Sequence, residues 1–411
     1  MESNKEVLKF TSYQKMVVAL LALTQFSVVL DFMIMNPLGD ALMKAMDLST
    51  MQFGIVVSSY AISAGVSGFL TAGFADRFDR KKMLVFFYIG FIIGTLLCGL
   101  VTNYELMVAA RIFTGIFGGV IGSISMAIVS DLFVAAQRGR AMGIMQMGFG
   151  ASQVLGIPIS LYLSYLWSWQ VPFFLVVLIA SVVCILLVIN LKPVVDHLKG
   201  ENEQNAFKHL FKTLKNRNYR IGFLATALMS MGGFMIMPWG SSFVVNNLKM
   251  TEIQLMLLFI IGGVITLLIM PFIGKISDKI DRFKLFTIAS IWMMIVVIIY
   301  TNMHDVSFWF LATMYSLMMM GVMSRMVPSM ALVTSLPELH DRGAFMSINS
   351  SLQQMAGGIA AAIGGLIVVQ KTKTSPLENY DNLGYVIALI VMICIFMVYR
   401  VSVLIKKKNS N

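Results

Sequence analysis

The chain has 411 residues, of which 58% are hydrophobic and 12% are charged, and its mean hydropathy is +0.82. Soluble globular domains average roughly half apolar and about a quarter charged residues, so this composition excludes an ordinary soluble protein. It indicates a polytopic membrane protein.

Apolar runs long enough to cross about 30 Å of hydrocarbon recur along the whole chain. We expect twelve transmembrane helices, at residues 16–38, 51–73, 83–101, 105–129, 141–165, 169–191, 219–247, 253–274, 285–301, 306–333, 343–369 and 382–404. The first fifteen residues are polar and the run after them is too long for a signal peptide, so no cleavable leader is expected. The predicted fold class is therefore all-α.

Basic residues separate the two sides of the membrane. The two termini and every second loop hold most of the Lys and Arg, whereas the opposite loops hold only Lys44, Lys249, Lys371 and Lys373. The positive-inside rule therefore predicts that both termini are cytoplasmic. The same asymmetry explains the net charge of +11, so no nucleic-acid partner is expected.

A long polar segment divides the spans into six and six. The predicted organisation is a six-helix bundle at residues 1–191, a cytoplasmic linker at 192–218 and a second bundle at 219–411. Within the linker, FKHLFKTLK places apolar residues at helical spacing between lysines. This spacing favours a short amphipathic helix on the inner membrane surface, although a plain basic linker is an equally good interpretation.

Two loop motifs recur in the second half at nearly one offset. ADRFDRKK at 75–82 is matched by SDKIDRFK at 277–284, and QRGRAMG at 137–143 is matched by DRGAFMS at 341–347. Two matched pairs in corresponding loops indicate a duplicated six-helix unit, and parallel repeats of this kind are a transporter architecture.

On these motifs the chain resembles the major facilitator superfamily, and most of all its twelve-span drug:proton antiporters. AGFADRFDRKK follows the loop signature G-x-x-x-D-R-x-G-R-[RK], except that Ala72 and Asp79 stand where the glycines belong. RIFTGIFGG, which begins at Arg111, follows the fourth-span motif R-x-x-x-G, whereas the fifth-span glycine–proline motif is degenerate in GASQVLGIPISL. The resemblance implies two pseudo-symmetric six-helix bundles that work by alternating access.

The resemblance also implies a cytoplasmic latch. Asp76 would cap the eleventh span near Arg342, and Arg80 would meet Asp131, so that the network holds the outward-open state closed on the cytoplasmic side. If the loop at residues 75–82 served only to orient the chain in the membrane, this would explain its lysines but not the acidic residues between its basic ones. The predicted latch residues are Asp76, Arg77, Arg80, Asp131, Asp278, Arg282 and Arg342.

Only three formal charges lie six or more residues from both ends of a predicted span: Asp31, Arg111 and Arg325. Inserting a charged side chain at the centre of a transmembrane helix costs roughly 2.5–3.5 kcal/mol, so each of these residues is expected to face the bundle interior. Asp31 lies about 24 Å along its helix from Lys15, and Arg111 lies about 9 Å from Glu105, which places both at a similar depth. The family resemblance implies that the first and fourth spans both line the central cavity. We therefore predict that Asp31 and Arg111 pair and couple transport to protons, although a static structural pair is an open alternative.

Arg325 has no counterpart in the first half. It suits an anionic group on a substrate, and a snorkelling structural role explains it equally well. Uncharged polar residues extend the predicted cavity, although such side chains also join helices in membranes. The predicted substrate-cavity residues are Gln25, Asn36, Gln146, Gln153, Arg325, Asn349 and Gln353.

The leading functional hypothesis is a monomeric secondary transporter of a bacterial inner (plasma) membrane. It would export small organic or amphiphilic compounds, multidrug fashion, against proton entry. The alternative is a proton symporter or facilitator that imports a sugar, peptide or organic anion, because the fold does not determine direction. None of the four histidines lies in a predicted span, and no HExxH motif or P-loop occurs, so we expect no enzyme, no catalytic residue, no metal site and no cofactor.

Overall fold

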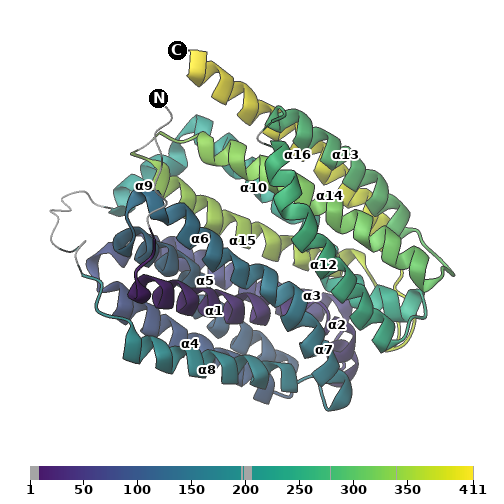
Figure 1. Ribbon diagram of the computed structural model, residues 1–411. Coiled ribbons are helices and arrows are strands. Elements are labelled where there is room, and N and C mark those ends of the chain that lie inside the picture. Colours follow the sequence, from purple (N-terminus) through teal and green to yellow (C-terminus); the bar gives the residue numbers. More distant parts are fainter. Residues whose placement is uncertain (1–8, 196–197, 199–205, 278, 339, 411) are drawn as a thin grey trace.

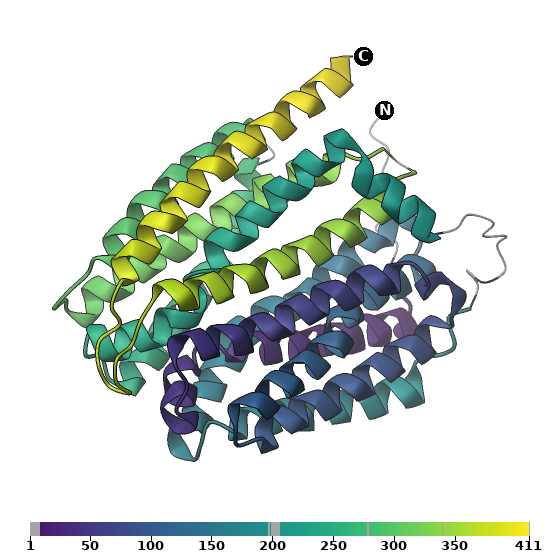
Figure 2. The same cartoon turned by 180° about the vertical axis from the view of Figure 1, so that it is seen from behind.

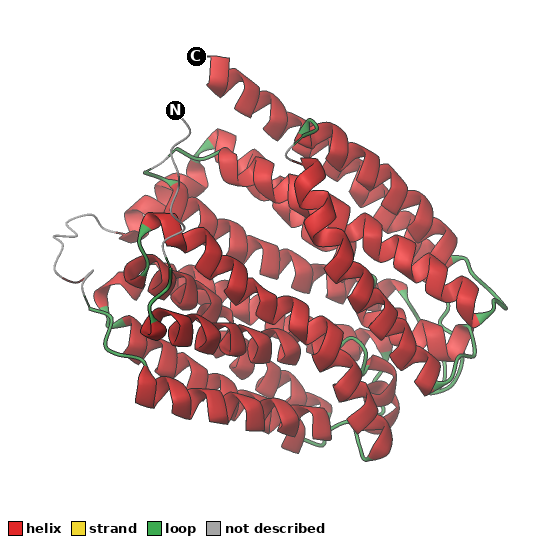
Figure 3. Ribbon diagram, viewed as in Figure 1, coloured by secondary structure: helices red, strands yellow, loops and turns green. Residues whose placement is uncertain are grey.

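The computed structural model describes residues 9–195, 198, 206–277, 279–338 and 340–410. Within these ranges the chain folds into helices joined by short loops, as Figure 3 shows, with one isolated antiparallel bridge between Val369 and Glu378. The all-helical fold predicted from the sequence is confirmed.

The helices follow one another along each half of the chain. The first half forms α1 (Ser12–Ile34), α2 (Gly39–Met46), α3 (Thr50–Ala72), η1 (Ala75–Arg77), α4 (Arg80–Leu100), α5 (Tyr104–Leu132), α6 (Ala135–Ala151), η2 (Ser152–Gly156), α7 (Ile157–Leu166) and α8 (Val171–Asn190). The rest forms α9 (Ala206–Lys215), α10 (Arg217–Phe234), η4 (Met237–Trp239), α11 (Gly240–Ser242), η5 (Phe243–Asn247), α12 (Glu252–Ser277), α13 (Arg282–Thr301), α14 (Phe308–Ser335), α15 (Arg342–Ile367) and α16 (Tyr380–Ser410).

Among the described residues, eleven helical segments are long and apolar enough to cross a membrane. α15 matches the eleventh predicted span, at residues 343–369, but small and polar residues lower its hydropathy. Two predicted spans are interrupted helices: α6 and α7 are joined by the π-helical turn η2, and α10 is followed by the short turns η4, α11 and η5.

The helices of the first half lie together, and α10 to α16 lie beside them (Figures 1 and 2). Both chain ends and α9 occupy one end of the molecule, which we call the terminal end; α2 and α7 lie at the opposite, distal end. The predicted bundle boundaries at residues 191 and 219 fall between α8 and the first turn of α10.

The two halves meet along α3 and α15, which pack through glycines. A Cβ atom on Gly65 would lie 2.7 Å from the carbonyl oxygen of Ser351, and one on Gly54 would lie 3.0 Å from that of Ala361. Any larger residue would therefore push the two backbones apart, as expected for small residues at a helix interface in a membrane.

The repeated loop motifs have a shared structural reason for carrying aspartate where the family signature has its second glycine. Asp79 accepts a hydrogen bond from the backbone N–H of Lys81 at 2.9 Å, and Asp281 accepts bonds from Phe283 and Lys284 at 3.0 Å each. Both aspartates are therefore N-caps, of α4 and α13 respectively.

α9 is the amphipathic helix predicted within the linker, but its apolar side chains contact the protein. Leu210 is 3% exposed, and the Phe211 ring packs edge-on against Phe69 of α3 at 6.2 Å. A Cβ atom on Gly73, at the end of α3, would collide with the Phe207 ring. α9 also packs on α10 and α15, so it touches both halves at the terminal end.

Candidate functional site

The two predicted proton-coupling residues are in direct contact. Arg111 donates a hydrogen bond from Nη1 to Oδ2 of Asp31 at 3.0 Å, and the side chains are 1% and 0% exposed. Asp31 lies in the last turn of α1 and Arg111 in the first third of α5, so both are nearer the distal end. The contact inferred from matched depths is present, and pairing is what allows two charges to be buried there.

Tyr60 of α3 covers the cation of this pair. The guanidinium carbon of Arg111 lies 4.3 Å from the centroid of the buried Tyr60 ring, which is a cation–π contact. The contact between Tyr60 and Arg111 could not be predicted from the sequence, because no motif links a residue on α3 to one on α5.

The glycines of the R-x-x-x-G motif explain how Tyr60 reaches its position. A Cβ atom on Gly118 would lie 2.6 Å from the Tyr60 hydroxyl oxygen, and one on Gly115 would collide with the Tyr60 backbone. The motif therefore allows α3 to approach α5 closely enough to place an aromatic ring over Arg111. A search for an aromatic residue on α3 facing these glycines could have found it.

The ion pair leaves part of its hydrogen-bonding capacity unused. Within the described protein, Oδ1 of Asp31 and Nε of Arg111 are buried without a hydrogen-bond partner. A buried polar atom left unsatisfied costs about 1–3 kcal/mol. The arrangement is therefore less stable than a fully bonded structural pair would be.

Aromatic contacts connect the site to the other half of the chain. Phe32, the residue after Asp31, packs against Tyr60 at 5.4 Å and against Phe234 of α10 at 5.5 Å between ring centroids. A displacement of α1 at the ion pair would therefore act directly on α10.

The halves are sealed against each other at the distal end. Asn246 donates a hydrogen bond to Oδ1 of Asp40 at 2.5 Å, and Lys44 binds the other oxygen of Asp40 at 2.6 Å. Ser241 donates to the carbonyl oxygen of Asn36 at 3.0 Å. Asp40 is 9% exposed, although it was not among the predicted site residues because it lies just beyond the predicted first span.

Further contacts extend this distal seal. The Thr50 hydroxyl donates to the carbonyl oxygen of Val368 at 2.7 Å, and the Phe53 ring meets Trp239 edge-on at 5.6 Å. Each contact joins the first half to the second, so the route between the halves is closed at this end.

The seal is formed by corresponding segments of the internal repeat. PLGD at 37–40 and PWGS at 238–241 interrupt the first helices of the two halves in the same manner. A Cβ atom on Gly39 would lie 2.9 Å from the carbonyl oxygen of Pro238, so the two breaks pack backbone to backbone.

The predicted contact between Arg80 and Asp131 is present. Arg80 donates from Nε to Oδ2 of Asp131 at 3.3 Å and from Nη1 to the carbonyl oxygen of Ala75 at 3.1 Å. The sequence analysis associated this contact with the outward-open state. Here it joins α4 to α5 within the first half while the distal end is sealed, so it does not by itself mark that state.

The remaining latch residues do not form a described network. Asp278 and the side chain of Asp76 lie outside the described part of the structure, and so does the predicted cap of Asp76 on the eleventh span. Three other predicted latch residues are exposed at the terminal end: Arg77, Arg282 and Arg342.

Arg325 lies inside the second half, away from the Asp31 pair. It is 2% exposed, donates from Nε to the Ser290 hydroxyl at 2.9 Å and contacts the sulfur of Met293 at 2.7 Å. Its guanidinium carbon lies 5.5 Å from the centroid of Phe286. Its surroundings are therefore mostly α13 side chains.

The other predicted cavity residues differ in exposure. Gln25, Gln153 and Asn349 are half-buried, whereas Gln146 and Gln353 are exposed. Within the described residues, no hydrogen bond joins the side chains of these five to one another.

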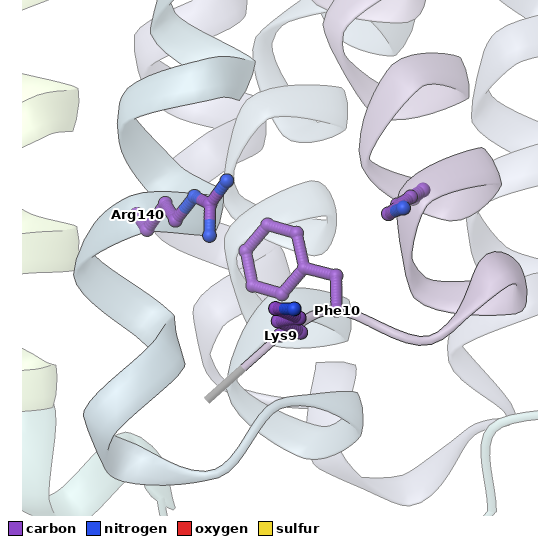
Figure 4. A pocket seen from close by; sticks show the side chains of 4 residues that line it. Lys9, Phe10 and Arg140 are labelled. Carbon is purple, nitrogen blue, oxygen red and sulfur yellow. The ribbon is translucent and has the colours of Figure 1, made fainter. Parts of the chain in front are cut away.

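A separate pocket lies at the terminal end and is lined by Lys9, Phe10, Lys15 and Arg140. Figure 4 shows the Phe10 ring with Arg140 and Lys9 close by, and the Arg140 guanidinium carbon lies 4.8 Å from the ring centroid. None of the predicted cavity residues lines this basic pocket.

The chain matches a family model described as Major Facilitator Superfamily over residues 21–361 and 222–411. Multidrug resistance protein 2 of Bacillus subtilis is 22% identical over 365 residues, which cover 87% of this chain and 90% of that protein. The uncharacterized MFS-type transporter YbcL of the same bacterium is 25% identical over 366 residues, covering 88% and 89%. The match to another B. subtilis transporter, YceJ, is 26% identical and spans 62% of this chain and 65% of that protein.

Two solved structures share the fold. A bacterial homolog of the human lysosomal transporter Spinster, in an inward-facing and unoccupied conformation, superposes with a TM-score of 0.77 at 14% identity, covering 97% of this chain and 99% of that one. The D-xylose-proton symporter has a TM-score of 0.77 at 18% identity, covering 94% and 97%.

Proposed function

We propose that this chain, which belongs to the Major Facilitator Superfamily, exports small organic or amphiphilic compounds in exchange for protons. As a superfamily member it is a multi-pass membrane transporter of a small-molecule substrate and not an enzyme. The observation that carries the proposal is the fully buried pair of Asp31 and Arg111, whose oxygen and nitrogen lie 3.0 Å apart. Intramembrane ionisable residues of this kind mark proton and substrate pathways.

Protonation of Asp31 would favour a change of conformation. A proton on the carboxylate leaves Arg111 as a buried cation without a counter-charge, and breaking a buried pair in this way costs about 3–5 kcal/mol. The proton therefore acts as a ligand that disfavours the present conformation. Full inversion of a two-state equilibrium needs about 5.5 kcal/mol, so substrate bound from the terminal end must first open the distal seal. The proton that Asp31 then takes up from outside is expelled when the pair forms again.

The contacts of Phe32 provide the route by which this change would act on the second half. Phe32 follows Asp31 in α1 and packs on both Tyr60 and Phe234. When α1 moves at the ion pair, α10 and the helix break that follows it move with it, and the distal seal opens.

The direction of transport follows from the proposed orientation. With both termini in the cytoplasm of a cell (plasma) membrane, the sealed distal end faces outside, and substrate enters from the terminal end. Asp31 lies nearer the distal end, so protons reach it from outside once the seal opens. The relatives named multidrug resistance proteins support a drug-like substrate. The transporter works as a monomer without a cofactor, and the proton gradient drives it.

Everted membrane vesicles with an acidified lumen test the proposal, with ethidium as a lipophilic-cation probe. Ethidium should release protons from the lumen and accumulate there uphill in wild-type vesicles. Asp31→Asn should reduce both fluxes at least tenfold. Glu105→Gln, which changes an exposed carboxylate on the helix that carries Arg111, should leave them intact.

Two outcomes would contradict the proposal. If Asp31→Asn still supports uphill, proton-dependent accumulation, the pair does not couple the proton. If a transported compound and protons move in the same direction, the chain is a symporter, and the importing alternative is correct.

A further inference from the structure

Two histidines from distant parts of the chain meet around one carboxylate at the terminal end. Nε2 of His209, on α9, lies 2.8 Å from Oδ1 of Asp341, and Nε2 of His340 lies 3.2 Å from the same oxygen. The two imidazole rings are almost parallel, with centroids 6.4 Å apart. Oε2 of Glu338 lies 3.5 Å from Nδ1 of His340.

These side chains have the spacing of ligands to one small metal ion. Glu338, His340 and Asp341 can each offer one ligand atom, with all three atoms within 4.8 Å of one another, and His209 adds a fourth donor. Two ligands on a tetrahedral ion with bonds of about 2.0–2.1 Å lie about 3.3 Å apart. Two imidazole nitrogens and two carboxylate oxygens are also a donor set that Zn²⁺ accepts.

Neighbouring groups prepare the carboxylate for such an ion. Tyr219 of α10 donates a hydrogen bond to Oδ2 of Asp341 at 2.9 Å, which leaves Oδ1 facing the histidines. An outer hydrogen-bond partner of this kind fixes the orientation of a ligating carboxylate.

We propose that His209, His340, Asp341 and Glu338 form a binding site for one transition-metal dication of the zinc class. Zn²⁺ would accept lone pairs from neutral imidazoles, so the proton on Nε2 of His209 would move to Nδ1 and the hydrogen bond to Asp341 would be exchanged for two metal bonds. A metal site was not predicted from the sequence, because none of the histidines lies in a predicted span and no HExxH motif occurs. His209 and Asp341 are 132 residues apart along the chain.

The position of the site gives the ion a structural consequence. His209 lies on α9, whereas the other three ligands lie in the connection between α14 and α15 and at the N-cap of α15. The Phe207 and Phe211 rings of α9 pack against α3 in the first half. A bound ion therefore fastens α9 to the second half while its aromatic residues hold the first.

Titration of the full-length protein with Co²⁺, purified in detergent without a histidine tag and freed of metal by chelation, tests the site. We expect one Co²⁺ per chain, with visible absorption of a four-coordinate ion that disappears when Zn²⁺ is added. His209→Ala and His340→Ala should each weaken binding more than tenfold. Glu338→Gln, at a side chain that is 65% exposed and so tolerates change, should weaken it severalfold.

Matched histidine variants identify the ligands. His304, which is exposed in the loop after α13, and His197, which lies outside the described residues, should be dispensable when each is replaced by alanine. Absence of stoichiometric binding, binding that survives His209→Ala together with His340→Ala, or loss of binding in His197→Ala would each overturn the assignment. Because metal binding is measured without transport, this result is independent of the proton-coupling proposal.

Discussion

Asn246 of the second half and Asp40 of the first share a hydrogen bond of 2.5 Å at the distal end, and this bond connects corresponding segments of the internal repeat. Asp40 is also bound by Lys44 four residues later, so its carboxylate is held from both halves. A repeat-to-repeat contact of this kind can break when the halves separate at this end, without disturbing the packing inside either half.

We predict that Asn246→Ala favours opening of the distal end. The substitution leaves one buried oxygen of Asp40 without its donor, at a cost of about 1–3 kcal/mol, which corresponds to a shift of about 5- to 150-fold in the equilibrium. Spin labels at Glu105→Cys and Asp305→Cys, on exposed residues of the two halves, should report a longer distance in the variant.

The neighbouring asparagine supplies the control for this measurement. Asn247 exchanges hydrogen bonds with the backbone of Leu377, and both residues belong to the second half. Asn247→Ala should therefore leave the distance unchanged. An equal effect of the two variants would show that the change reflects general loss of stability instead of opening.

A double-mutant cycle on Asp31 and Arg111 distinguishes pairing from coupling. Asp31→Asn or Arg111→Gln alone should destabilise the protein by about 3–5 kcal/mol, because each leaves one buried charge uncompensated. The double variant should lose less unfolding free energy than the sum of the losses in the two single variants. Thermal unfolding followed by tryptophan fluorescence measures all three.

Transport by the same double variant tests whether the pair couples the proton or only joins two helices. We expect it to remain folded but to lose proton-dependent accumulation of ethidium, because no ionisable carboxylate remains at the site. Retained proton dependence in the double variant would indicate that the pair serves only to join α1 and α5.

Tyr60 should act through its ring and not through its hydroxyl. Tyr60→Phe keeps the face over Arg111 and should retain transport. Tyr60→Ala removes a cation–π contact worth up to about 2 kcal/mol and leaves a cavity in a buried site, for a total cost of about 3–5 kcal/mol. Transport rates and unfolding temperatures of Tyr60→Phe and Tyr60→Ala test this prediction. If both variants lose transport equally, the hydroxyl and not the ring is the important group.

Gly119→Ala should be among the most damaging single-methyl additions in the chain. The new Cβ atom would lie 2.5 Å from Cα and 2.7 Å from the carbonyl carbon of Ala64, and backbone atoms cannot move aside without separating α3 from α5. Overpacking of this kind costs about 1–3 kcal/mol or more. We expect a lower unfolding temperature and impaired transport.

Gly143→Ala is the matched control, since no atom lies within 4 Å of the added Cβ position on α6. Alanine is favoured over glycine in a helix by about 1 kcal/mol, so this variant should be as stable as wild type or more so. Equal damage from both substitutions would mean that flexibility of the glycine, and not close packing, matters at Gly119.

Asp281 should contribute pH-dependent stability through its cap on α13. The backbone hydrogen bond from Lys284 is the main cause that holds the pKa of Asp281 below its ordinary value of 3.8; burial opposes it, and Lys406 at 3.4 Å adds to the lowering. An acid with a lowered folded pKa contributes stability that is present above the unfolded pKa and lost as pH falls through the folded one.

Asp281→Ala should therefore cost about 1 kcal/mol at pH 7, typical of a lost N-cap. The difference in unfolding free energy between Asp281→Ala and wild type should shrink at pH values below 3.8. Thermal unfolding at several pH values measures this difference. Asp281→Asn keeps a capping oxygen and should be less damaging at pH 7. A difference that persists unchanged at low pH would assign the effect to packing.

The helices and the depth of the charged residues could be predicted from the sequence because both are local properties. Hydropathy over some twenty residues decides whether a segment can cross a membrane, and the rise per residue then sets the depth of each charge. Matched depth, together with the family resemblance that places the first and fourth spans at one cavity, led to the proposed contact between Asp31 and Arg111. The repeat motifs likewise indicated the two halves, and α9 is present where helical spacing in the linker predicted it.

The tertiary structure alone decided which side chains meet. Tyr60 reaches Arg111 because glycines on α5 admit α3, Asn246 reaches Asp40 because the two repeats abut at the distal end, and His209 reaches Asp341 because α9 folds back on α15. Such contacts depend on how helices cross and rotate against each other. Residues 206 positions apart leave no common periodicity from which their meeting could be predicted.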